Sequence, residues 1–136
     1  MNIYFAASIR GGRDDQEIYK QLIETLRSFG TVLTEHFGNK EIQACAGTGK
    51  DVHAIYKQDM EWVTMADVIV AEVTQPSLGV GYEIGRAEVM GKRILCLYRE
   101  MPDRSLSAMI SGNKKLQVKT YISPEEVKSI LEEFFA

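Results

Sequence analysis

The segment at residues 67–72 reads DVIVAE and is the strongest indication of the fold. Its residues 68–71 are all apolar and three of them are β-branched, without the polar alternation of a half-exposed strand, so the segment predicts a strand buried on both faces of a parallel sheet. Residues 73–78 contain Pro76 and are typical of a loop, and residues 79–90 have the apolar spacing of a helix. A buried strand, a loop and a helix in succession are the repeating unit of an α/β fold.

The same alternation continues in both directions along the chain. Further strands are predicted at residues 3–7, 31–34, 93–98 and 116–118, further helices at residues 14–29, 51–66 and 106–110 and after the cap at Ser123, and a loop at residues 37–50. We therefore expect a mainly parallel five-stranded sheet with helices on both faces. A chain of 136 residues fits one domain, residues 1–136, and its ligands are expected beyond the carboxyl ends of the strands.

Composition narrows the class of protein. Hydrophobic residues at 45% and charged residues at 26% indicate a folded domain, and the net charge of −3 argues against a nucleic-acid polymer as partner. The N-terminus lacks the features of a signal peptide, and no apolar run reaches the length of a membrane span. We expect a cytoplasmic protein that does not bind membranes, with a nuclear location also open. Cys45 and Cys96 fit no metal spacing, and Cys96 is expected to be a buried thiol.

Two acidic residues fall on the apolar faces of predicted helices. Asp59 belongs to a stripe formed by Val52, Ile55, Tyr56, Val63 and Ala66. Glu83 lies among Val80, Ala87 and Met90. We expect it in the first turn of the helix, where the helix dipole favours an ionised carboxylate. Burying a carboxylate is costly, so each residue should have a partner or a chemical role. Two inward acids in unlike surroundings favour a glycoside-cleaving pair. A structural hydrogen bond for Asp59 and helix capping for Glu83 are the alternatives.

Residues 75–81, QPSLGVG, lead from the strand into the helix and favour a phosphate monoester site. Gly79 permits close backbone approach, the helix start has free N–H groups, and Ser77 adds a hydroxyl donor. The glycine spacing departs from the dinucleotide fingerprint, and Gly81 could equally serve tight helix–sheet packing. Residues 47–50, GTGK, fail as a nucleoside-triphosphate loop because the flanking positions hold Ala44 and Asp51.

Residues 8–13, SIRGGR, follow the first strand and are a second candidate ligand loop. Their two arginines can pair with phosphate or stack on a base, and a solvated turn is the alternative. His36 follows the second strand near the same edge and is a weaker candidate for a base contact.

These segments together resemble the 2'-deoxynucleoside 5'-phosphate N-hydrolases of the wider nucleoside 2-deoxyribosyltransferase superfamily. The similarity is carried by residues 4–5, 8–13, 33–36, 66–83, 93–97 and 106–110. It implies a flavodoxin- or Rossmann-like three-layer sandwich. It also implies hydrolysis of the N-glycosidic bond of 2'-deoxynucleoside 5'-monophosphates, with no metal or organic cofactor. Ala7 stands where many members have glycine, and residues 37–50 align poorly, which leaves the preferred base open.

The resemblance also implies roles for particular residues. Glu83 would be the nucleophile that forms a 5-phospho-2-deoxyribosyl ester, Tyr4 would position it, and Asp59 would act near the leaving base. Ser107 would reach the phosphate in the neighbouring subunit of a homodimer. The implied substrate-binding residues are Ala7, Ser8, Ile9, Arg10, Gly11, Gly12, Arg13, His36, Ser77, Gly79, Ser107, Ala108 and Met109.

Two other functions compete with this one. A deoxyribosyltransferase would use the same nucleophile but pass the sugar to a second base. A receiver domain of the same fold class would bind without catalysis, but it needs an acidic cluster after the first strand, where this chain has residues 7–9, ASI.

Overall fold

The computed structural model describes residues 1–9, 13–34 and 51–136. Five strands form one sheet in the order β2-β1-β3-β4-β5, and every pairing is parallel. The strands are β1 Asn2–Ala7, β2 Thr31–Leu33, β3 Val68–Glu72, β4 Arg93–Arg99 and β5 Gln117–Tyr121. The predicted five-stranded parallel sheet is confirmed, although β5 runs further than expected.

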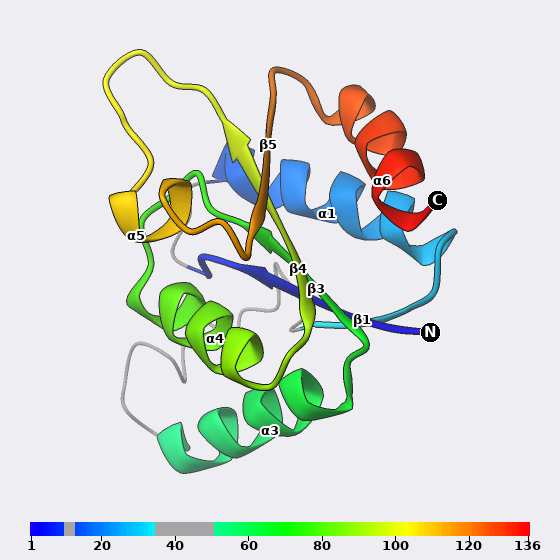
Figure 1. Cartoon of the computed structure of the whole chain (residues 1–136), viewed down its shortest axis with the longest axis vertical. Coiled ribbons are helices and arrows are strands. Elements are labelled where there is room, and N and C mark those ends of the chain that lie inside the picture. Colours follow the sequence, from blue (N-terminus) through cyan, green and yellow to red (C-terminus); the bar gives the residue numbers. More distant parts are fainter. Residues whose placement is uncertain (10–12, 35–50) are drawn as a thin grey trace.

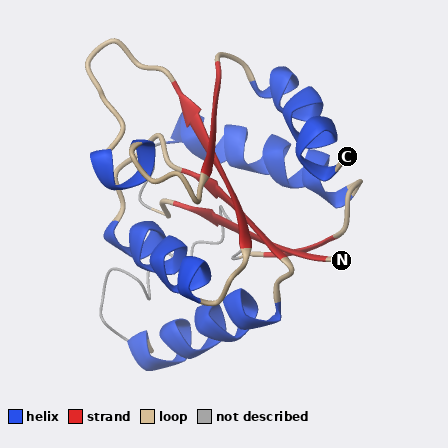
Figure 2. Ribbon diagram, viewed as in Figure 1, coloured by secondary structure: helices blue, strands red, loops and turns tan. Residues whose placement is uncertain are grey.

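Helices cover both faces of the sheet and give three layers (Figures 1 and 2). On one face lie α1 (Arg13–Arg27) and α6 (Val127–Phe135), and on the other lie α3 (Val52–Met65) and α4 (Leu78–Val89). The short α5 (Ala108–Ser111) and the 3-10 turn η1 (Pro124–Glu126) connect the last elements. The cap expected at Ser123 is confirmed: Ser123 and Glu126 form a capping box at the start of η1, which leads directly into α6.

Each face of the sheet packs its own apolar core, because successive strand residues point to opposite sides. Phe5, Val70 and Leu97 face α1 and α6, whereas Tyr4 and Ile69 face α3 and α4. All five residues of β3 are buried, which explains its uninterrupted apolar run. Cys96 is a buried free thiol, as expected, and burial raises its pKa to about 12.

The order of the strands fixes where a ligand can bind. The chain goes from β1 outward to β2 and then returns to β3 on the other side of β1, so the strand order reverses between β1 and β3. The last residues of these two strands, Ala7 and Glu72, are paired in register. Ligands of open α/β sheets bind at such a reversal, beyond the carboxyl ends of the strands.

The inward stripe expected on α3 is only partly correct. Val63 and Ala66 are buried, but Val52 and Tyr56 are 46% and 53% exposed. The Tyr56 ring instead packs at the surface against Tyr82 of α4, with ring centroids 6.4 Å apart. The first turns of α3 therefore contact the neighbouring helix rather than the core.

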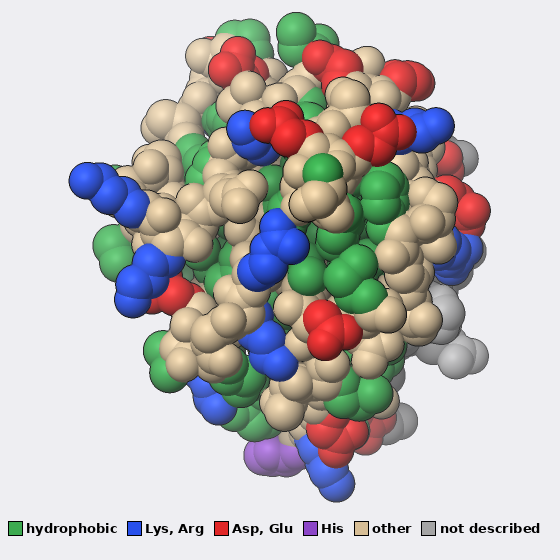
Figure 3. Space-filling view, turned by 45° about the vertical axis from the view of Figure 1, so that its right-hand side comes forward, with side chains coloured by type: hydrophobic (Ala, Val, Ile, Leu, Met, Phe, Trp, Pro, Cys, Tyr) green, Lys and Arg blue, Asp and Glu red, His purple; other side chains and the backbone are tan. Residues whose placement is uncertain are grey.

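The surface carries charges of both signs. Figure 3 shows Lys and Arg side chains interspersed with Asp and Glu on one face of the molecule, and on that face they do not form a continuous basic surface. Across the ranges that the structure describes, no helix has both the length and the apolar character needed to cross a membrane.

Candidate active site

A cavity of about 200 Å³ lies at the carboxyl edge of β1, between α3 and the start of α4. Tyr4, Asp59 and Glu83 line it, together with Ser77 and Gly79. Two carboxylates that are 24 positions apart in the sequence and belong to different helices therefore face one small space. The cavity stands at the reversal of strand order, where the fold predicts a ligand.

Tyr4 holds Glu83 from the floor of this cavity. Tyr4 belongs to β1, which lies between β2 and β3 in the sheet, and is 3% exposed. The centroid of its ring lies 6.3 Å from that of the Trp62 ring. Its hydroxyl donates a hydrogen bond to Oε2 of Glu83. A strand buried in the sheet is a rigid base for such a contact, so the carboxylate of Glu83 is oriented before any ligand arrives.

The helix dipole contributes less to Glu83 than its expected place in the first turn suggests. Helix α4 begins at Leu78, and Glu83 is its sixth residue, in the second turn. The effect of the dipole falls off within the first turn, so that argument for Glu83 is wrong. A hydrogen bond from a tyrosine hydroxyl to an ionised carboxylate is a stronger local interaction and takes its place.

Asp59 reaches the cavity from the opposite side. It lies on α3, is half-buried, and lines the cavity beside Ile55. The two carboxylates thus approach from facing helices, and one of them is fixed by Tyr4. Such a pair can divide nucleophilic and proton-transfer work in glycoside cleavage.

The loop before α4 brings backbone and hydroxyl donors to the same cavity. Ser77 caps α4, and its Oγ accepts from the amide of Val80 at 3.2 Å, which leaves its hydroxyl hydrogen able to reach a ligand. Gly79 lies in the first turn, whose amides have no acceptors within the helix. A Cβ at Gly79 would meet only Ser77 Oγ, at 3.9 Å, so a ligand can approach the backbone closely. The segment can bind an anion such as a phosphate.

Gly81 does not serve tight helix–sheet packing. A Cβ at Gly81 would have no neighbour within 4 Å, and the same holds for Gly85. Both glycines instead line a second and larger cavity. The packing interpretation of Gly81 is therefore wrong.

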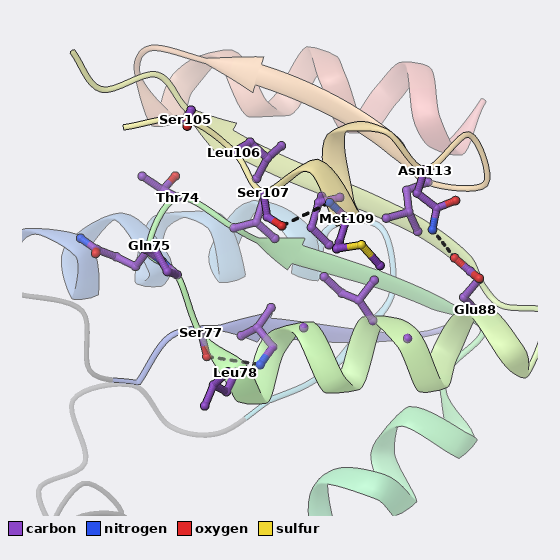
Figure 4. Close-up of a pocket in the computed structure, with 18 residues that line it drawn as sticks. Thr74, Gln75, Ser77, Leu78, Glu88, Ser105, Leu106, Ser107, Met109 and Asn113 are labelled. Carbon is purple, nitrogen blue, oxygen red and sulfur yellow. Dashed lines mark hydrogen bonds between the residues drawn. The ribbon is translucent and has the colours of Figure 1, made fainter. Parts of the chain in front are cut away.

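The second cavity has a volume of about 690 Å³ and lies between α4 and the segment around α5 (Figure 4). Ser107 and Met109 line it, and Ser77 lines both cavities. Ser107 caps α5, with its Oγ accepting from the amide of Met109 at 3.2 Å. Leu78 and Met109 both line this cavity and are 96% and 81% exposed, so apolar surface is left uncovered there.

The remaining predicted residues are divided between the two cavities and the rest of the chain. Ala7 and Ile9 line the small cavity, whereas Ser8 is buried at the end of β1 and Ala108 is exposed at the start of α5. Arg13 is the first residue of α1. Arg10, Gly11, Gly12 and His36 lie outside the described residues.

Sequence patterns missed a buried polar cluster on the far side of the sheet. Asp15 accepts hydrogen bonds from Arg99 and Gln75, and Glu72 accepts from Thr74 and Tyr121. These residues come from segments far apart in the chain, so no local pattern could have grouped them. Among the described residues, no three His, Cys, Asp or Glu side chains gather as they would around a metal ion.

Comparison with known proteins places this geometry in context. A sequence model of the nucleoside 2-deoxyribosyltransferase family matches residues 3–120. The 5-hydroxymethyl-dUMP N-hydrolase of Danio rerio is 53% identical over 139 residues, which cover 99% of this chain and 96% of that protein. The human protein of the same name is 50% identical over 140 residues, which cover 98% of this chain and 78% of that protein. The solved structure of the CMP N-glycosidase of Clostridium botulinum superposes with a TM-score of 0.67 at 18% identity, covering 97% of this chain and 99% of that one, and so shares the fold.

Proposed function

The chain belongs to the nucleoside 2-deoxyribosyltransferase family, and on that premise we propose that it hydrolyses the N-glycosidic bond of 2'-deoxynucleoside 5'-monophosphates. The products are a free nucleobase and 2-deoxyribose 5-phosphate. One observation carries the proposal: Glu83 is held by the Tyr4 hydroxyl in the cavity that Asp59 also lines. The names of relatives that share about half of its residues support hydrolysis rather than another use of that site.

In the first step the Glu83 carboxylate attacks the anomeric carbon of the deoxyribose. A bond forms between a carboxylate oxygen and that carbon, the bond to the base breaks, and its electron pair leaves with the base. Asp59 gives the departing base a proton. Positive charge builds at the anomeric carbon in the transition state, and the adjacent Glu83 carboxylate stabilises it. A sugar without a 2'-hydroxyl forms this cation more easily.

In the second step water hydrolyses the ester on Glu83. The water oxygen bonds to the anomeric carbon, the Glu83 carboxylate leaves, and Asp59 takes up the proton that the water loses. The sugar is released with a free anomeric hydroxyl, and both carboxyl groups return to their starting states. Brief incubation with substrate, acid quenching and mass spectrometry should find the sugar phosphate on the peptide that contains Glu83. Detection of the adduct on another peptide would contradict the assignment of the nucleophile.

The phosphate of the substrate binds away from the reacting bond. We assign Ser77 and Gly79, which line the small cavity, to its site, and Arg10 is a further contact proposed from the sequence. Binding energy from a remote group orients the sugar over Glu83 and contributes to catalysis without touching the bond that breaks.

The larger cavity is proposed as the contact between two copies of the chain. Ser107 of each copy would then complete the phosphate site of the other, with Ala108 and Met109 beside it. Two observations support this arrangement. Leu78 and Met109 are exposed at the larger cavity, and Ser77 lines both cavities. Sedimentation analysis should find a dimer at concentrations where the enzyme is active, and a fully active monomer would refute the shared site.

A transferase that passes the sugar to a second base is the competing function, favoured by the description of the matching family. The hydrolase and the transferase differ in whether water or a second base attacks the ester on Glu83. Incubating the protein with a deoxynucleotide and a different free base separates them. Base exchange without net release of 2-deoxyribose 5-phosphate would favour the transferase and overturn the hydrolase.

The domain organisation, the kind of partner and the cellular location of the protein are also proposed here as parts of its function. We propose that residues 1–136 form one domain and that its partner is the small-molecule substrate rather than a nucleic-acid polymer or a membrane. We propose a cytoplasmic location, with a nuclear one open. Imaging of the tagged protein in cells is the direct check.

A further inference from the structure

The loop that carries Ser77 is held from the side of the sheet opposite to the catalytic cavity. Tyr4 and the cavity lie on the face covered by α3 and α4. Val70 and Leu97 face α1 and α6 on the other side. Glu72 and Arg99 come two residues after them on the same strands, so their side chains are on that second face as well. Glu72 is the last residue of β3, with its side chain on this second face, and the chain then runs to α4, which covers the first face (Figure 1). Residues 73–77 therefore cross the edge of the sheet.

The first anchor of this loop is Gln75. Its Nε2 donates to Oδ2 of Asp15 at 2.8 Å, and Nη2 of Arg99 donates to Oδ1 of the same carboxylate at 2.6 Å. The side chains of Asp15 and Arg99 are 8% and 14% exposed. Burial alone would raise the pKa of Asp15, but the hydrogen bonds from Arg99 and Gln75 and the charge of Arg99 outweigh it and lower that pKa. The Asp15 carboxylate is thus ionised at neutral pH, and each of its oxygens accepts a hydrogen bond.

The second anchor is Thr74. Its amide donates to Glu72 at 2.7 Å, its hydroxyl donates to the same carboxylate at 3.0 Å, and its Oγ1 accepts from the amide of Arg99 at 2.9 Å. Glu72 is 1% exposed and also accepts from the hydroxyl of Tyr121. The loop is therefore tied to β4 directly and to β5 through Glu72.

Both anchors lie within three residues of Ser77. From this geometry we infer that Gln75, Thr74 and their partners Asp15, Arg99 and Glu72 are positioning residues for the phosphate subsite. They hold the loop so that the Ser77 hydroxyl and the Gly79 amide already stand where the phosphate arrives. The inference rests on the proposed function, because it concerns the phosphate of the proposed substrate. A preorganised site avoids the ordering cost that a free loop would add to binding.

Gln75 is the position at which to test the inference, because it is half-buried and its replacement leaves the Asp15–Arg99 pair intact. Gln75→Glu places a second carboxylate against Asp15 and releases the loop. Asp15→Asn combined with Gln75→Glu restores the contact with reversed polarity: the new amide at position 15 can accept from Arg99 and donate to position 75. The double change also leaves the net charge of the protein unaltered. Gln21→Glu adds the same charge on the exposed side of α1 and is the matched control.

The measurement is KM and kcat for a 5'-phosphorylated substrate, with the thermal midpoint of each variant. Gln75→Glu should raise KM about tenfold, from the loss of a hydrogen bond to a charged group, with kcat within about twofold of wild type. The double variant should restore KM, and Gln21→Glu should leave it unchanged. A merely structural network would lower the thermal midpoint or the active fraction without moving KM. An unchanged KM in Gln75→Glu, or no recovery in the double variant, would overturn the inference.

Failure of the proposed function can be told apart from failure of this inference. If the wild-type protein releases no 2-deoxyribose 5-phosphate, the proposed function is wrong. The affinity of the same variants for inorganic phosphate, followed by NMR titration, then tests the network without turnover. The same order of affinities supports the inference, and equal affinities overturn it.

Discussion

Replacing Tyr4 with phenylalanine should slow catalysis while leaving the fold intact. The ring of Tyr4 is buried, with 3% of the residue exposed, and Tyr4→Phe keeps its packing against Trp62. The change removes only the hydroxyl that donates to Glu83. A hydrogen bond to a charged group contributes about 1.5–3 kcal/mol, and without it the Glu83 carboxylate, the proposed nucleophile, is free to turn away from the sugar. At about 1.4 kcal/mol per factor of ten, kcat should fall roughly 10- to 100-fold.

The assay is release of free base under saturating substrate, together with the thermal midpoint of the variant. Tyr98→Phe is the matched control, because Tyr98 is buried in the same core and, among the described residues, its hydroxyl has no hydrogen-bond partner. That variant should keep its activity and lose no stability. If Tyr4→Phe retains full kcat, or if Tyr98→Phe loses as much, the orientation of Glu83 by Tyr4 is not what drives the rate.

The pKa of Asp15 is lowered in the folded state, so between that folded pKa and the ordinary value of 3.8 the unfolded chain binds more protons than the folded one, and the free energy of unfolding falls as the pH falls. Chemical unfolding at a series of acid pH values should show a shallower loss of stability in Asp15→Asn than in wild type. Parallel curves for the two proteins would contradict this. Gly91 has a φ of +76°, and a Cβ added there would meet no atom within 4 Å. Gly91→Ala should therefore destabilise the protein by about 1 kcal/mol through backbone strain alone, as measured by urea unfolding. An unchanged midpoint would mean that the turn relaxes. In the proposed dimer, mixing Glu83→Ala and Ser107→Ala subunits should restore about a quarter of wild-type activity. Half of the dimers are then mixed, and one of the two sites in each mixed dimer has both Glu83 and Ser107. No recovery would argue against a site shared between subunits.

The sequence was most informative where burial leaves a pattern. The apolar run of β3 predicted a strand covered on both faces because all five of its residues are in fact buried. Asp59 and Glu83 could be recognised as misplaced charges on helical faces, and the structure brings them to one cavity. Periodicity gives only a direction around a helix and no depth, which is why Val52 and Tyr56 were wrongly placed in the core.

Contacts between distant segments could not be predicted in this way. Gln75 and Asp15 are 60 residues apart, and Arg99 and Asp15 are 84 apart, so their meeting depends on strand order and register. The place of Glu83 in the second turn depends on where α4 begins, and sequence patterns set helix ends only to within a turn. The side chain that orients Glu83 comes from β1, which no spacing rule connects to α4.

The most direct test of the account compares wild type and Glu83→Gln on a panel of 2'-deoxynucleoside 5'-monophosphates that includes 5-hydroxymethyl-dUMP, with the matching ribonucleotides and unphosphorylated deoxynucleosides. Free base and 2-deoxyribose 5-phosphate are measured in each reaction. We expect wild type to cleave the phosphorylated deoxy compounds in preference to both other groups, and we expect Glu83→Gln to fold normally but to cleave none of them. Cleavage by Glu83→Gln at the wild-type rate, or no cleavage of any deoxynucleotide by the wild-type protein, would contradict it.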